Sequence, residues 1–371
     1  MEQLSGARVL RMTPGDALDR DASPVVGVGS ARRATCHAKL LCLASVFFAA
    51  TIAANAAADS AARRGTVSLA FATVREGREI LTQRDDFVQR LSPFDRSSRL
   101  KSGSDVSEEA YLQFVAENVR AWTADKKALV ESALASIRSR LDALSLPWPT
   151  EIYVITTTGR EEGGASYTRG NAIVLPSAVL LEESRSPGGL RRIIAHELFH
   201  ILSRNNPGLK EKLYAVVGFH PCGEIAFPTG LAAVKITNPD APRNDHCIRV
   251  KVADSSTWAM PILFSRAARY DVLKDGEFFT YLQLRFLLLD GGDSQAPRSV
   301  SFDDRQPRLV SLSDVTGFFE QVGRNTDYVI HPEEILADNF ALLVVEAGRV
   351  VVASPEVITR LRRVLQEARV S

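Results

Sequence analysis

The sequence predicts an α+β fold, because helical stripes of apolar residues and short β-branched segments occur along the same chain. Residues 124–144 carry apolar side chains at helical spacing, which predicts a helix with one buried face. Residues 152–157 and 167–175 predict short strands, the latter with a turn at Gly170. A second apolar helix is expected over residues 190–203, directly after these strands.

The helix expected over residues 124–144 has signals at both ends. Thr123 is a suitable N-cap, and Pro147 and Pro149 follow the last turn, where proline cannot continue a helix. We expect its apolar stripe to lie in the core. The stripe consists of Leu129, Val130, Ala133, Leu134, Ile137, Leu141 and Leu144.

Length and composition are those of a globular protein. The 371 residues are 45% hydrophobic and 24% charged, and the formal net charge is +1. Nucleic-acid binders need a basic surface that neutralises phosphates, whereas the dense Lys and Arg runs here lie near the N-terminus. We therefore expect no nucleic-acid partner.

Residues 1–58 are predicted to form an N-terminal extension with a signal peptide. An apolar run over residues 40–54 follows basic residues and is short for a membrane span. Small residues come next, so cleavage is expected near Ala56 or Ala58, and an uncleaved anchor is the alternative. The mature chain would then be periplasmic or secreted, without stable membrane insertion.

Two cysteines, Cys222 and Cys247, remain after the predicted signal segment. In an oxidising compartment a disulfide between them is the default expectation. The alternative is a structural zinc site that combines both cysteines with His220 and His246.

Residues 196–200 read His-Glu-Leu-Phe-His, which is the HExxH pattern. Because residues four apart share a helix face, His196 and His200 can bind one tetrahedral zinc ion. Zinc lowers the pKa of a bound water, and Glu197 is expected to accept the proton of that water as general base. The alternative is a coincidental or degenerate motif on a buried helix.

A catalytic zinc site usually has a third protein ligand and keeps one position open. Glu334 is predicted to supply it, from a helix expected over residues 332–345. Asp338 lies four residues later and can accept a hydrogen bond from the outer nitrogen of a ligating histidine. Glu333 has no acid four residues on and is the weaker candidate. The alternative is that these acids only favour the dipole of a first helical turn.

The segment HELFH, followed by a separate helix that carries EILAD, resembles the gluzincin metallopeptidases, the thermolysin-like group. The resemblance implies a zincin-like fold, with a small mixed sheet, an edge strand beside the HExxH helix and a second ligand-bearing helix. The strand within residues 167–175 would be the edge strand that pairs with extended substrate. The residues that match the family's zinc ligands, base and orienting acid are His196, His200, Glu334, Glu197 and Asp338.

The interval between the two ligand helices is far longer than in thermolysin. Residues around 205–330 are therefore expected to form an inserted subdomain within a metallopeptidase domain that spans residues 59–371. Gluzincins tend to stabilise the oxyanion with a Tyr or His, and Tyr328 and His331 are the candidates because they closely precede Glu334. Each could instead pack against the helix or cap it.

These features predict an exported, zinc-dependent endopeptidase that acts on a peptide or protein substrate; they indicate nothing about oligomeric state. One alternative is a peptidase dedicated to a cell-wall peptide or to a single partner. Another is an inactive, zinc-stabilised binding protein, although a structural zinc site has no need of Glu197 beside the metal. A membrane-embedded protease would need apolar runs of about eighteen residues around the motif, and none is present there.

Overall fold

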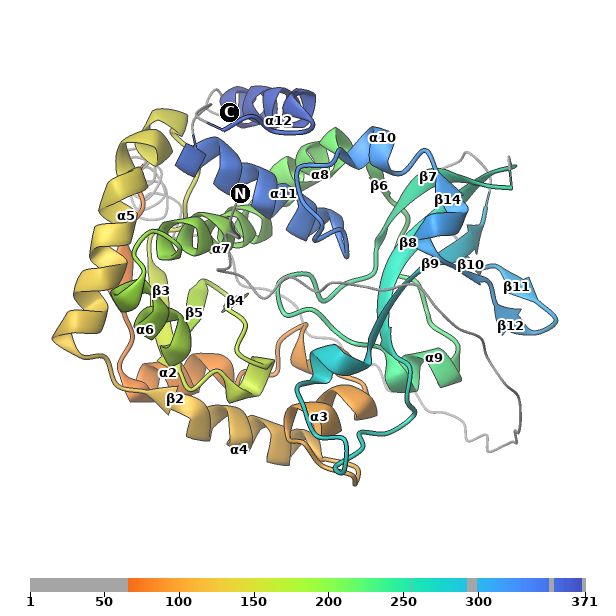
Figure 1. Ribbon diagram of the computed structural model, residues 1–371, viewed down its shortest axis with the longest axis horizontal. Coiled ribbons are helices and arrows are strands. Elements are labelled where there is room, and N and C mark those ends of the chain that lie inside the picture. The colour runs from red at the N-terminus through yellow and green to blue at the C-terminus, as the bar shows by residue number, and fades with distance from the viewer. Residues whose placement is uncertain (1–65, 254, 292–298, 347–349, 369–371) are drawn as a thin grey trace, which may run out of the picture. The chain divides into compact units, whose positions relative to one another are not determined.

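The computed structural model describes residues 66–253, 255–291, 299–346 and 350–368, which belong to one compact unit (Figure 1). The predicted N-terminal extension and signal peptide, residues 1–58, lie outside the described residues. Among the helices of the described chain, none combines the length and apolar character needed to cross a membrane.

A mixed sheet of five strands precedes the HExxH helix in the chain. Strands β1, β3 and β5 run parallel, while β4 is antiparallel to β5 and lies at the edge of the order β1-β3-β5-β4. Strand β2 pairs antiparallel with the end of β3. The segment 167–175 is thus a hairpin with its turn at Gly170, which has a φ of 53°. The strands are β1 (Leu69–Phe71), β2 (Val119–Arg120), β3 (Ile152–Thr157), β4 (Tyr167–Arg169) and β5 (Ala172–Pro176).

Helices cover both faces of this sheet, and alternate side chains of its strands are buried in two different hydrophobic clusters. Val154 and Ile173 belong to the cluster that includes helices α5 and α7. The next residues along each strand, Ile155 and Val174, belong to a cluster with helices α2 and α4. The sheet is therefore the middle of three layers. These helices are α2 (Val74–Leu81), α4 (Glu108–Asn118), α5 (Ala124–Leu144) and α7 (Leu190–Asn205).

The helix predicted over residues 124–144 is confirmed as α5, with Thr123 as its N-cap. The helix predicted over residues 190–203 is confirmed as α7, which extends to Asn205. The helix predicted over residues 332–345 differs: α11 ends at Ala341, and a π-helical turn follows over Leu342–Glu346. The remaining helices are α3 (Pro93–Arg99), α6 (Ser177–Arg185), α8 (Pro207–Val216), α9 (Thr229–Val234), α10 (Phe319–Val322), α11 (Pro332–Ala341) and α12 (Pro355–Glu367).

A second sheet, of seven antiparallel strands, lies within the predicted inserted subdomain. Its order is β10-β9-β8-β7-β14, with β6 paired to β7 and β13 paired to β9. Ile248 of β7 and Phe286 of β9 belong to the same hydrophobic cluster as helix α7, so this sheet shares its core with the rest of the unit. Its strands are β6 (Phe219–Pro221), β7 (His246–Val252), β8 (Ser255–Ser265), β9 (Leu282–Asp290), β10 (Ser299–Val300), β13 (Leu309–Val310) and β14 (Val315–Thr316); a separate small hairpin joins β11 (Phe302–Asp303) to β12 (Gln306–Pro307).

Candidate metal centre

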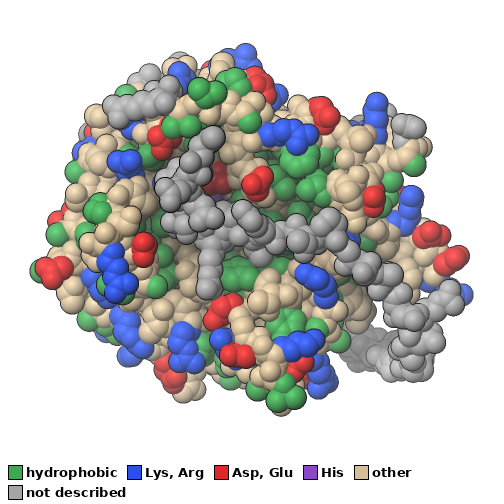
Figure 2. Space-filling view, in the orientation of Figure 1, with side chains coloured by type: hydrophobic (Ala, Val, Ile, Leu, Met, Phe, Trp, Pro, Cys, Tyr) green, Lys and Arg blue, Asp and Glu red, His purple; other side chains and the backbone are tan. Residues whose placement is uncertain are grey.

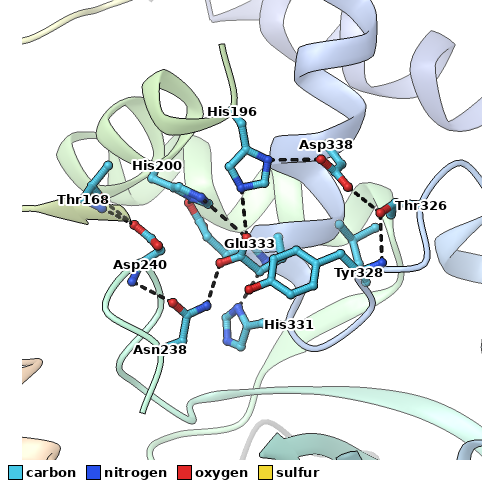
Figure 3. A network of polar contacts seen from close by, with 12 residues as sticks. Thr168, His196, His200, Asn238, Asp240, Thr326, Tyr328, His331, Glu333 and Asp338 are labelled. Atoms are coloured by element: carbon cyan, nitrogen blue, oxygen red, sulfur yellow. Dashed lines mark hydrogen bonds and ion pairs between the residues drawn. The ribbon is translucent and has the colours of Figure 1, made fainter. Parts of the chain in front are cut away.

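Helices α7 and α11 lie side by side and bring the predicted ligands together (Figures 1 and 3). His196 and His200 lie one helical turn apart on α7, and Glu334 lies in the first turn of α11. The Nε2 atom of His196 is 3.0 Å from Oε2 of Glu334, and the Nε2 atom of His200 is 3.6 Å from the same oxygen. Ligand atoms of a tetrahedral zinc ion lie about 3.3 Å apart, so these spacings suit such an ion.

One observation tests whether a metal ion fits this group. The side chain of His200 is buried, and its Nε2 atom has no hydrogen-bond partner among the described residues. A buried polar atom without a partner is costly, and a metal ion bound by Nε2 would remove that cost. The donor set of two imidazoles and one carboxylate is also one that zinc accepts in catalytic sites.

The outer nitrogens of both histidines are held by carboxylates of α11. Nδ1 of His196 lies 3.2 Å from Oδ1 of Asp338, whose other oxygen accepts a hydrogen bond from Thr326. Nδ1 of His200 lies 3.0 Å from Oε1 of Glu333. These contacts leave each Nε2 directed at Glu334 and fix the orientation of the two rings. Asp338 thus contacts the outer nitrogen of His196, as predicted. The corresponding contact of Glu333 with His200 was not predicted.

Glu333 is itself held by two hydroxyl groups. Its Oε2 accepts hydrogen bonds from Ser203 Oγ at 2.8 Å and from the Tyr214 hydroxyl at 2.5 Å. Burial alone would raise the pKa of Glu333, but the contact with His200 and the hydrogen bond from the Tyr214 hydroxyl lower it. Glu333 therefore stays ionised and can hold the ring of His200.

Several carboxylates surround the two histidines, and they control the pKa values of the rings. Burial opposes the charged form of each imidazole, yet Asp338 and Glu334 raise the pKa of His196 well above its usual value. In the same way Asp240, Glu334 and Glu333 outweigh burial and raise the pKa of His200 to about 9. The site thus favours bound positive charge, whether as protons or as a metal ion.

Glu197 lies beside these groups and has a different environment. Its side chain is 3% exposed, and its Oε2 has no hydrogen-bond partner among the described residues. Burial raises the pKa of Glu197, and the negative charge of Asp240 adds to the effect. A carboxylate with a raised pKa and a free oxygen is suited to accept and return a proton near neutral pH.

Tyr328 and His331, the two residues predicted to stabilise the oxyanion, have different surroundings. Tyr328 is half-buried, and burial together with the charges of Glu334 and Asp240 raises its pKa well above 10, so its hydroxyl keeps its proton. His331 is the N-cap of α11: its Nδ1 accepts a hydrogen bond from the Glu333 amide at 3.1 Å. Burial lowers the pKa of His331 to about 4, which keeps Nδ1 an acceptor.

Two residues near the site were not anticipated from the sequence. Asn238 donates a hydrogen bond of 2.6 Å from Nδ2 to Oε1 of Glu334. An oxygen of Asp240 lies within 4.8 Å of an oxygen of Glu197 and a ring nitrogen of His200. Both residues come from the loop between α9 and β7, in which no periodic pattern indicates a role (Figure 3).

The cysteine pair lies away from this centre. Cys222 directly follows β6, Cys247 lies on β7, and both are buried in one hydrophobic cluster. His246 instead contacts Glu211 and Asp245, and its ring lies 4.6 Å from that of Tyr214. Neighbouring residues of a strand face opposite sides, so His246 is directed away from Cys247 and the proposed four-ligand zinc site is not assembled. The disulfide stays a prediction.

Comparison with family models, with curated proteins and with solved structures gave no match to this chain. The candidate site is therefore interpreted from its own geometry and chemistry.

Figure 2 shows Lys and Arg side chains dispersed among Asp and Glu side chains on one face of the described molecule.

Proposed function

We propose that this chain is an exported, zinc-dependent peptidase. The observation that carries the proposal is the convergence of three groups, Nε2 of His196, Nε2 of His200 and the carboxylate of Glu334, at spacings that suit zinc. A purely structural site would not need the buried, unpartnered oxygen of Glu197 next to these groups. The likeness to gluzincins, with a glutamate as third ligand on a second helix, supports the same proposal.

When bound, zinc would supply Lewis acidity, which polarises the scissile carbonyl and acidifies a water molecule. Glu197 would accept a proton from the attacking water and return it to the nitrogen of the leaving amine. Tyr328 keeps its hydroxyl proton and would donate it as a hydrogen bond to the developing oxyanion. Asp338 and Glu333 would hold the two imidazole rings in orientation.

The test compares zinc content and peptide hydrolysis in the wild type and in three variants. Glu334→Gln should lose most of its zinc. Glu197→Gln should keep its zinc but hydrolyse peptides at least about 100-fold more slowly, because it lacks the general base. Glu131→Gln changes an exposed glutamate on α5 and should match the wild type in both respects.

The proposal fails if Glu334→Gln keeps a full equivalent of zinc, because the third ligand would then be misassigned. It also fails if the wild type retains zinc but hydrolyses neither casein nor short peptides. That second result would favour the inactive, zinc-stabilised binding protein.

A further inference from the structure

Asp240 lies beside Glu197, the residue proposed as general base. One of its carboxylate oxygens is within 4.8 Å of both Glu197 and His200. The set of proposed ligands, which is defined by the same distance, does not include Asp240. Two ligands of one zinc ion lie about 3.3 Å apart. Glu197, His200 and Asp240 are close enough to hold an ion themselves, but Asp240 does not join the group of His196, His200 and Glu334, so it lies beside the general base and is not a fourth ligand of that group.

The Asp240 carboxylate is anchored to the edge strand β4. Its Oδ1 accepts hydrogen bonds from the backbone amide of Thr168 at 2.7 Å and from the Thr168 hydroxyl at 2.6 Å (Figure 3). Arg204 of α7 donates to the Thr168 hydroxyl at 2.8 Å and to the carbonyl of Asp240 at 3.3 Å. For Oδ2, no hydrogen bond is found within the described part of the chain, so this oxygen can bind a ligand.

A buried network holds the segment that carries Asp240. Asp95 and Arg99 of α3 form an ion pair of 2.6 Å with side chains that are 0% exposed. Asp95 accepts a hydrogen bond from the amide of Thr237, and Arg99 donates one to the carbonyl of the same residue. Ser92 donates to the carbonyl of Lys235 at 2.7 Å. Residues 235–240 thus form a fixed wall of the site.

This wall limits how a peptide can bind along β4. The Thr168 amide points away from β5, and an extended substrate would normally pair with such an outward amide. Here the Thr168 amide already donates a hydrogen bond to the carboxylate of Asp240. A peptide that extends past this point has no free amide of Thr168 to pair with and meets a carboxylate. The geometry favours a substrate that ends beside the wall.

We propose that Asp240 binds the α-ammonium group of the substrate, so that the enzyme removes residues from the N-terminus of peptides. The nitrogen of an N-terminal residue lies only about 2.5 Å from the carbonyl carbon that is attacked. A group that recognises it must therefore lie next to the general base, as Asp240 does beside Glu197. The buried, unpartnered atoms Glu197 Oε2 and His200 Nε2 mark the adjoining space as a polar binding site.

This inference rests on the proposed peptidase function and changes the predicted endopeptidase into an aminopeptidase. The reaction is the same hydrolysis. Water supplies a hydroxyl group to the acyl carbon, the carbon–nitrogen bond breaks, and the leaving amine receives the proton. Asp240 would touch the substrate without taking part in the proton transfer.

The test measures equilibrium binding to zinc-loaded Glu197→Gln protein, which binds a peptide without rapid turnover. The probes are Leu-Ala-Ala, N-acetyl-Leu-Ala-Ala and N-acetyl-Lys-Ala-Ala. The free peptide should bind about 10- to 100-fold more tightly than its acetylated form, because a charge-assisted contact is lost on acetylation. Adding Asp240→Asn, which keeps an oxygen for Thr168, should remove this difference. Adding Asp303→Asn, at an exposed site on β11, should leave it unchanged.

Several results would overturn the inference. Equal binding of free and acetylated Leu-Ala-Ala to the Glu197→Gln protein would do so, and this measurement, made with Asp240 intact, decides even if the Asp240 variant does not fold. Tight, Asp240-dependent binding of N-acetyl-Lys-Ala-Ala would assign the site to a side-chain ammonium instead. A fall in zinc affinity of more than about 100-fold in Asp240→Asn, beyond the range for a residue that only orients a ligand, would make Asp240 a metal ligand.

Turnover by the wild-type protein separates this inference from the proposed function. Cleavage of N-acetylated peptides as fast as free ones would leave the peptidase function standing and remove the aminopeptidase inference. Retention of zinc without cleavage of any peptide would remove the proposed function itself.

Discussion

The ligand helices α7 and α11 and the wall formed by residues 235–240 meet at one site but are built differently. His196, His200 and Glu334 hold their positions through regular helical spacing and through the packing of α7 against α11. Asp240 holds its position through contacts to residues far away in the chain, such as Thr168. Helical spacing can be recognised in a sequence, whereas a loop fixed by distant side chains cannot.

The comparison implies that the two regions can be damaged separately. Substitutions of Asp338 or Glu333, whose carboxylates contact the outer nitrogens of the histidines, should weaken metal binding with little effect on residues 235–240. Changes in the buried network of α3 should destabilise the fold and the wall while leaving the ligand helices with their full donor set.

The largest effect is expected from Arg99→Ala. This substitution leaves the buried carboxylates of Asp95 and Glu162 without their cation, and breaking such an ion pair costs about 3–5 kcal/mol. The free energy of unfolding, measured by urea titration at neutral pH, should fall by that amount. Arg75→Ala is the control, because the ion pair of Arg75 with Glu79 is exposed and should contribute little. A loss below about 1 kcal/mol in Arg99→Ala would contradict the expectation that this buried network stabilises the fold.

The second effect concerns the carboxylates behind the histidines. Asp338→Asn and Glu333→Gln each weaken the group that orients one ring, and zinc affinity should fall about 10- to 100-fold in each. Competition with a chelator of known affinity measures this change. If Glu333→Gln binds zinc as tightly as the wild type, Glu333 does not support His200. Asp338 would then be the residue of this pair that still orients a ligand.

The third effect is a pH dependence of zinc binding. In the metal-free protein the pKa of His200 is raised to about 9 and that of His196 is raised as well, so protons compete with zinc for both rings at neutral pH. Each ring must lose a proton to bind zinc. Apparent affinity should therefore rise with pH up to about 9, by up to tenfold per unit for each histidine. Calorimetry at pH 6, 7 and 8 measures it, and an affinity that is constant over this range would contradict the assigned ring environments.

The helices and the ligand group follow from the sequence because their signals are local. The HExxH spacing, the stripe of α5 and the four-residue interval between Glu334 and Asp338 each express one period of a helix. The strands at 152–157 and within 167–175 were also predictable, because β-branched residues gather there.

The rest depends on contacts that no local pattern reveals. The sequence favours Glu334 over Glu333 because only Glu334 has an acid four residues on, yet Glu333 contacts His200 on another helix. Asn238 and Asp240 lie in a loop whose place is set by Asp95 and Thr168, each more than 70 residues away from its partner in the chain. Such residues are found only when the fold brings them together.

The most direct test of the metal centre is anomalous diffraction at the zinc absorption edge, from crystals of the zinc-loaded protein. We predict one peak about 2.0–2.2 Å from Nε2 of His196, Nε2 of His200 and a carboxylate oxygen of Glu334. No peak at this position, or a peak bound by Glu197 and Asp240 in place of Glu334, would contradict the account.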